Sequence, residues 1–141
     1  MIQRKQTLWL LLAGIFAFIS LKTSFFSGIR TNDTIHKDVV FVSASYNMLL
    51  TIFTIATATV AIITIFLFKN RKLQMRFSIL SFLLSLLTLG LYYWQSKSFI
   101  TAQTSVNLTA IIPFAIPVLI IMAIVGINKD EKLIKSVDRL R

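Results

Sequence analysis

The chain has no cysteine, one histidine and five acidic residues, and each of these shortages excludes a kind of chemistry. Without cysteine there is no disulfide, no thiol nucleophile and no Cys-ligated zinc or iron–sulfur site. The single histidine, His36, lies with Asp33 and Asp38 in the polar stretch RTNDTIHKDVV. This stretch is either a solvated loop or a metal site. No second ligand cluster supports the metal site. We therefore expect no metal, no cofactor and no catalytic residue.

Charge as a whole is scarce as well, since charged residues make up 14% of the 141 residues and apolar residues 56%. A soluble domain has about 25% charged residues. Four long segments lack Asp, Glu, Lys, Arg and His, namely 7–21, 39–68, 77–94 and 108–127. Each contains, or can extend to, the roughly 20 residues that cross a bilayer as a helix. The sequence predicts an all-α membrane protein with one domain at 1–141, an antiparallel bundle of four transmembrane helices at about 6–26, 46–68, 77–95 and 107–127, and a tail at 128–141.

The first two apolar runs differ in length. We extend the short first run to about Phe26, with the Lys22 amine reaching towards the lipid headgroups. The second run is longer than a span needs, so we place Val39–Asn47 at the membrane interface. Arg4 and Lys5 also fit the start of a secretory signal peptide, but a small-x-small cleavage site is replaced here by SLKTSFFSG. We therefore favour a retained membrane anchor.

Basic residues predict the orientation of the chain. Two precede the first span, four lie between the second and third, and five follow the fourth, against three and one in the other two connections. Because cytoplasmic segments of membrane proteins are enriched in Lys and Arg, both termini are predicted to be cytoplasmic. A net charge of +10 also occurs in nucleic-acid-binding proteins, but orientation already explains it. We expect no nucleic-acid partner.

The third and fourth spans contain features that favour either packing or transport. The prolines of the fourth span, Pro113 and Pro117, predict a bend, or free carbonyl groups that a cation or water could use. The third span has polar residues at steps of three or four, which share one helix face. This face is either a seam of small residues between packed helices or the lining of a substrate path. Its residues are Ser78, Ser81, Ser85 and Thr88.

The tail KDEKLIKSVDRLR carries eight charged residues in thirteen, directly after a span that has none. Leu133, Val137 and Leu140 step by four and three, which predicts a short amphipathic C-terminal helix. Its apolar stripe could lie on anionic lipids of the inner leaflet, on the protein's own basic face, or against a protein partner or second copy. The residues predicted to dock a partner or lipid are Arg71, Lys72, Arg76, Lys132, Leu133, Lys135, Val137, Arg139 and Leu140.

Three stretches share the predicted cytoplasmic face, and they are MIQRKQTLWLLLA, FLFKNRKLQMR and KDEKLIKSVDRLR. With these stretches the whole chain resembles a family of small four-span bacterial membrane proteins that is catalogued only as a domain of unknown function. The resemblance implies four helices and a multi-pass location in the bacterial inner membrane. It implies no activity, no ligand and no site residue.

Two kinds of function fit these features. The first is a non-enzymatic structural or accessory subunit that docks partners through its basic cytoplasmic face. The alternative is a small transporter or channel-like oligomer that uses the polar face of the third span and the bent fourth span. The spans lack the carboxylate that coupled transport commonly needs, and they lack a general base that could activate a hydroxyl. We therefore favour the first function and expect no enzyme.

Overall fold

The computed structural model describes residues 5–29, 39–97, 99 and 105–138, with side chains up to Lys132. Most of this part is helical, as predicted. The helices are α1 (Lys5–Ser20), α2 (Met48–Phe66), α3 (Arg71–Ser96) and α4 (Ile111–Asp138), with 3₁₀ turns at Leu67–Lys69 and Leu108–Ala110. The strands are β1 (Ser24–Gly28), β2 (Val40–Ser43) and β3 (Ser105–Val106).

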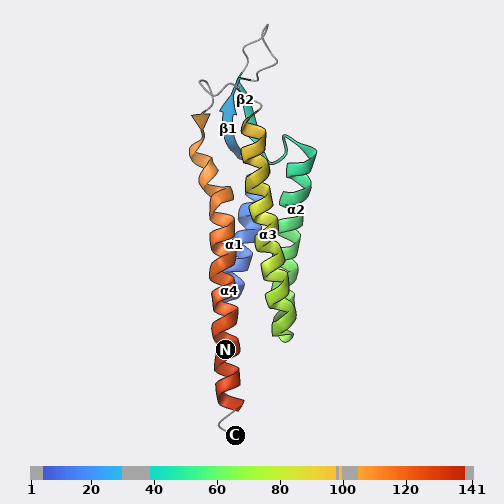
Figure 1. Cartoon of the computed structure of the whole chain (residues 1–141), viewed down its shortest axis with the longest axis vertical. Helices are drawn as coiled ribbons and strands as arrows, with labels where there is room; N and C mark the ends of the chain where they lie inside the picture. The colour runs from blue at the N-terminus through green and yellow to red at the C-terminus, as the bar shows by residue number, and fades with distance from the viewer. Residues whose placement is uncertain (1–4, 30–38, 98, 100–104, 139–141) are drawn as a thin grey trace.

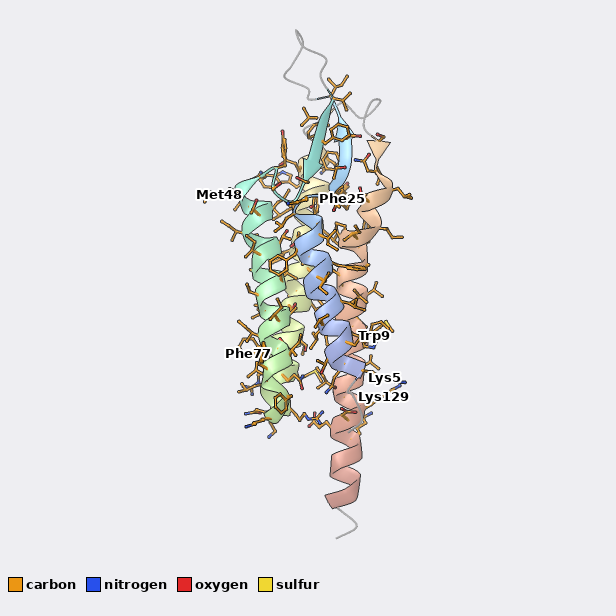
Figure 2. All side chains as sticks on the ribbon, turned by 180° about the vertical axis from the view of Figure 1, so that it is seen from behind. Lys5, Trp9, Phe25, Met48, Phe77 and Lys129 are labelled. Carbon is orange, nitrogen blue, oxygen red and sulfur yellow. The ribbon has the colours of Figure 1, made fainter. Side chains whose placement is uncertain are left out.

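The four helices lie side by side and run in alternating directions along the long axis of the molecule (Figure 1). α1 packs against α2 and α4, and α3 packs against the same two helices. The strands gather at one end, which we call the sheet end (Figure 1). We call the opposite end the charged end. Lys5 at the start of α1 and Lys129 of α4 both lie at the charged end, whereas Phe25 and Met48 lie at the sheet end (Figure 2).

Among the described residues, three helical stretches are long and apolar enough to cross a membrane, namely Met48–Lys69, Arg71–Ser96 and Leu108–Lys132. α1 is apolar but has 16 residues. At a rise of 1.5 Å per residue it is about 24 Å long, against a hydrocarbon core of about 30 Å. The outward faces of the helices expose large Leu, Ile and Phe side chains. These lengths and exposed side chains are those of a membrane protein.

The sheet end corrects the all-α prediction. β1 pairs antiparallel with β2 on one side and with β3 on the other, in the order β2-β1-β3. The predicted extension of the first helix to Phe26 is therefore wrong, because α1 ends at Ser20 and Phe26 lies in β1. Polar and aromatic residues after Ser20 favour a strand, and the pairing satisfies backbone groups that a longer helix would otherwise satisfy.

An aromatic core joins the sheet to the helices. The Tyr92 ring of α3 stacks on Phe25 of β1, with centroids 4.3 Å apart and planes 16° apart. Phe26 meets Phe99 edge to face at 5.2 Å. Tyr92 is 0% exposed and Phe26 is 1% exposed. Because each buried aromatic ring removes a large apolar surface from solvent, this cluster anchors the strands to α3.

A tight turn connects α2 to α3. The Asn70 side chain accepts a hydrogen bond from the backbone N–H of Leu73, 3.4 Å away, and so caps α3. Asn is a strongly preferred residue at this position because its oxygen satisfies an otherwise free helix N–H. α3 therefore begins at Arg71, within the basic stretch that the sequence analysis placed between two spans. Lys72 and Arg76 lie on its first two turns.

α4 corrects a second prediction, because it runs without a break from Ile111 to Asp138. The expected separate C-terminal helix is instead a continuation of the fourth helix. The residues after Gly126 include Lys, Glu, Leu and Ile but no proline, so nothing interrupts the helix when its surroundings change from apolar to charged. Of the two prolines, Pro113 lies in the first turn and Pro117 inside the helix, where it leaves the Pro113 carbonyl without its helical donor.

Candidate docking site at the charged end

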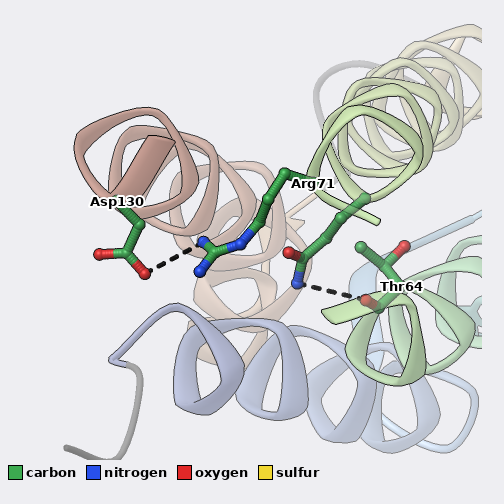
Figure 3. Close-up of polar contacts among 4 residues, drawn as sticks. Thr64, Arg71 and Asp130 are labelled. Atoms are coloured by element: carbon green, nitrogen blue, oxygen red, sulfur yellow. Dashed lines mark hydrogen bonds and ion pairs between the residues drawn. The ribbon is translucent and has the colours of Figure 1, made fainter. Parts of the chain in front are cut away.

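One ion pair joins α3 to α4 at the charged end. Nη1 of Arg71 donates to Oδ2 of Asp130 over 3.2 Å, as Figure 3 shows. The Arg71 side chain is 16% exposed and the Asp130 side chain 35%. Pairs this exposed stabilise a protein by about 0–1 kcal/mol, because solvent screens them. The pair therefore sets the position of α4 against α3 more than it holds the fold together.

Two buried glutamines lie behind this ion pair. Gln74 of α3 is 0% exposed, and its Nε2 donates to the backbone oxygen of Thr64 in α2 over 3.4 Å (Figure 3). Its Oε1 accepts no hydrogen bond from the part of the chain that the structure describes. Gln6 of α1 is 2% exposed, and neither atom of its amide has a partner among the described residues. A buried polar group without a partner costs about 1–3 kcal/mol, so this cluster is a destabilising feature of the isolated chain.

The two glutamines lie at the same depth. A Cβ atom at Gly126 of α4 would lie 3.2 Å from the Cβ atom of Gln6, so these two residues face each other closely. Gly126 is one helical turn before Asp130, and Gln74 is one turn after Arg71. Because Arg71 and Asp130 are paired and the two helices run in opposite directions, both glutamines lie about one turn inside the ion pair.

The predicted polar face of the third span is buried between the helices. Ser78, Ser81, Ser85 and Thr88 are all 8% exposed or less. The hydroxyls of Ser78, Ser85 and Thr88 donate to carbonyls of their own helix at 2.7–2.9 Å. Ser81 alone among these four donates to another helix, to the Thr57 oxygen of α2 at 3.4 Å. Hydroxyls that are used in this way let helices approach closely and supply little binding chemistry.

A small cavity lies between these hydroxyls and the first turn of α4. It is lined by Ser20, Thr54, Thr57, Ser85, Thr88 and Pro113, together with apolar neighbours, and its volume is about 10 Å³. A single water molecule needs roughly 10–15 Å³ measured in this way. The cavity therefore holds no more than about one water, which is too little for a substrate.

The predicted docking residues occupy different environments. Lys72, Arg76 and Lys132 are exposed, whereas Arg71 is half-buried and paired with Asp130. The backbone of Leu133, Lys135 and Val137 lies in α4, but their side chains are outside the described part. Arg139 and Leu140 lie outside the described residues, as do His36 and its two aspartates. The residues that are described contain no group of three or more His, Cys, Asp or Glu side chains that could hold a metal.

The sequence analysis missed Gln6, Gln74 and Asp130. A signal for Gln74 was present, because it lies four residues before Ser78 and so extends the polar row of α3 by one step. Gln6 likewise extends the buried series Leu10, Ala13, Ala17 back by four. Asp130 had no such signal, since its partner is 59 residues away in the chain.

The comparisons with known proteins identify a family but no function. No curated protein and no solved structure matches the chain. A family model with the description "Domain of unknown function (DUF4293)" matches residues 2–140, which is nearly the whole sequence. This match confirms the resemblance to a domain of unknown function. The chain therefore belongs to the DUF4293 family.

Proposed function

We propose that the protein is a non-enzymatic accessory subunit of the bacterial inner membrane, which docks a partner protein through its charged end. The contact element in this proposal is the extension of α4, supported by the exposed cations Lys72, Arg76 and Lys132. Anionic lipids of the inner leaflet surround the same cations. The charged end faces the cytoplasm.

The observation that carries the proposal is the continuity of α4. The ion pair places Asp130 beside Arg71, the first residue of α3. α4 continues to Asp138, about 12 Å further along its axis at 1.5 Å per residue, and projects beyond the other helices (Figure 1). A rigid helix that is fixed to the membrane domain presents its side chains in a defined direction, so a partner that binds it loses little conformational entropy on docking.

The interior of the protein supports docking over chemistry. The hydroxyls of α3 donate to backbone carbonyls, and the cavity beside them holds at most about one water. The apolar runs 48–68, 77–94 and 108–127 contain no carboxylate that could act as a general base. Within this proposal, the surface that docks a partner protein is the charged end.

The orientation rests on the distribution of basic residues between the two ends. Eleven Lys and Arg residues belong to the segments of the charged end and four to those of the sheet end. Segments rich in Lys and Arg stay in the cytoplasm during insertion. Trp9 lies towards the charged end of α1 (Figure 2), where an indole ring is favoured at the headgroup boundary.

A truncation after Lys132 tests the docking role. It removes residues 133–141 but keeps Asp130, so the ion pair with Arg71 and the described side-chain contacts remain. The matched control scrambles residues 133–141, which keeps their length and charge but breaks the spacing of Leu133, Val137 and Leu140. All three proteins would be purified from native membranes in mild detergent, and co-purifying proteins would be identified and quantified.

We expect a stoichiometric partner with the native tail, and we expect both altered tails to lose it while the rest of the chain keeps its fold. If the scrambled tail still binds the partner, the α4 extension contributes only its net charge to docking. If no protein depends on the tail, while a tail peptide with Leu133→Glu and Val137→Glu loses binding to anionic liposomes, then the extension is a lipid contact and the docking function is wrong.

The competing function is a small transporter or channel-like oligomer. The observation that favours it is the buried polar row on α3 that continues into Gln74. A water-filled path would make cysteines at Ser81 and Ser85 react with small hydrophilic thiol reagents in intact membranes. The packing seam predicts no reaction at either position, because both residues are buried and the cavity beside Ser85 holds at most about one water.

A further inference from the structure

Gly90 is a helix-interior glycine that the fold of this chain does not explain. It lies on the exposed face of α3, and a Cβ atom built on it meets no described atom within 4 Å. Glycine inside a helix costs about 1 kcal/mol relative to alanine. Gly126, by contrast, is needed where α4 approaches Gln6. The missing side chain at Gly90 therefore leaves open space on the surface of α3.

The space at Gly90 belongs to an apolar groove on the surface of α3. The groove has a volume of about 480 Å³ and is lined by Leu83, Leu86, Leu87, Gly90 and Leu91. None of these residues has a polar side-chain atom. Leu83, Leu86 and Leu87 are about half exposed, so the groove opens outward to the surroundings of the helix.

Two aromatic rings near the end of α3, and a cation directly after that helix, lie beyond the groove. Tyr93 is 68% exposed and Trp94 is 66% exposed, as expected for rings at a headgroup boundary. The Nζ atom of Lys97 lies 5.3 Å from the centroid of the Tyr93 ring. Gly90, Tyr93 and Lys97 are three and four residues apart, which places them on one face of α3. Lys97 lies about 10 Å beyond Gly90 along the helix axis.

We propose that this face of α3 is a specific site for one glycerophospholipid. One acyl chain occupies the groove at Gly90, and the phosphate binds the Lys97 ammonium group at the level of Tyr93 and Trp94. The order along the helix, from apolar groove to aromatic ring to cation, matches the order from acyl chain to glycerol to phosphate in the lipid. The opposite charges of ammonium and phosphate give the site its orientation.

The neighbours of Gly90 favour a lipid over a second copy of the chain. Close packing of two membrane helices needs small residues in succession, usually four apart, so that the backbones meet along a ridge. The residues three and four positions from Gly90 are Leu86, Leu87, Tyr93 and Trp94. All four are large, so the recess at Gly90 is short. An acyl chain fits such a recess, whereas the broad surface of a helix does not.

Native mass spectrometry of the full-length protein in mild detergent, titrated with phosphatidylglycerol, tests the site. Gly90→Phe fills the groove, and because its Cβ has open space around it, the fold is expected to tolerate the change. Lys97→Gln removes the cation. The matched controls are Ile79→Phe on the exposed part of α3 and Lys22→Gln, which removes an exposed cation of the sheet end. A thermal melt of each variant checks folding.

We expect the native chain to retain one phosphatidylglycerol, Gly90→Phe to lose it, and Lys97→Gln to need about fivefold more lipid for half saturation. Both controls should behave as the native chain does. Undiminished retention by folded Gly90→Phe would overturn the site, and so would an equal loss in Lys22→Gln, which would indicate general surface charge. A native dimer that Gly90→Phe converts to a monomer would show that a second copy occupies the groove.

Discussion

The two ends of the molecule satisfy their polar groups to very different degrees. At the sheet end, Asn107 donates through Nδ2 to the Ser24 hydroxyl at 2.7 Å and accepts from the Ser27 hydroxyl at 3.2 Å. Its backbone N–H donates to the Phe25 carbonyl at 3.1 Å. At the charged end, Gln6 and Gln74 leave three buried side-chain atoms without a partner in the described chain, close to the ion pair between Arg71 and Asp130.

Under the proposed docking function, this difference separates an end that holds the fold from an end that a protein partner completes. A buried polar group without a partner is costly, so evolution usually keeps one only where something else satisfies it or where function needs it. Among the described residues, the sheet end has one such group, the Tyr92 hydroxyl, within a dense aromatic cluster. The charged end combines its unpaired amides with a projecting helix, and this combination fits an end that a partner completes.

The largest expected effect is at the aromatic core of the sheet end. Tyr92→Ala should lower the free energy of unfolding by about 3–5 kcal/mol, because it empties the space between α3 and Phe25. Tyr92→Phe keeps the ring and removes only an unpaired hydroxyl, so it should be neutral or slightly stabilising. Reversible unfolding in mixed micelles measures both. An equal loss in the two variants would mean that the hydroxyl, and not the stack, holds the cluster.

The second-largest effect on stability is expected at the contact between α1 and α4. Gly126→Leu should cost about 1–3 kcal/mol, because even a Cβ atom there lies 3.2 Å from the Cβ of Gln6 and the rest of the side chain has no room. Gly90→Ala is the matched control on α3, where a Cβ meets nothing within 4 Å, and it should stabilise by up to about 1 kcal/mol. The same unfolding experiment compares them. If Gly126→Leu stabilised the protein while Gly90→Ala destabilised it, the close approach at Gln6 would be contradicted.

The helices could be predicted because their signals are local. A run of apolar residues between charges predicts a membrane helix wherever it occurs, and α2, α3 and α4 follow from such runs. The spacing of the α3 hydroxyls predicted one face, and that face is buried. The strand β1 could not be predicted in this way, since SFFSG continues the apolar character of the first run and its partners come from two distant segments. The polar and aromatic residues favour a strand only weakly, and the pairing decides between a strand and the end of a helix.

The candidate site was predictable in its charges but not in its contacts. The basic stretch around Arg71 is visible in the sequence, but its ion pair joins two segments that are distant in the chain. The continuity of α4 was also missed. A change from apolar to charged residues marks the exit from a membrane, and helix formation does not stop there unless Gly, Pro or a cap ends it.

The third prediction concerns the unpaired amides of the charged end. Gln6→Leu removes two buried polar atoms that have no partner in the described chain, so it should be neutral or stabilise by up to about 2 kcal/mol. Gln74→Leu also removes the bond to the Thr64 carbonyl and should gain less. A loss of more than about 1 kcal/mol in Gln6→Leu would show that an ordered water or ligand satisfies this amide and that the charged end is complete without a partner.

The smallest effect is expected at the ion pair, and a double-mutant cycle measures it. Arg71→Ala, Asp130→Ala and the double variant should give a coupling energy below about 1 kcal/mol, because the Asp130 side chain is 35% exposed and solvent screens the pair. The coupling should fall further as salt rises from 0.01 M to 1 M, where the screening length shrinks from about 30 Å to 3 Å. A coupling of several kcal/mol that salt leaves unchanged would mean that the pair is shielded from solvent. The charged end would then be held as firmly as the sheet end. A strong ion pair, and not a weak one, would then fix the position of the α4 extension.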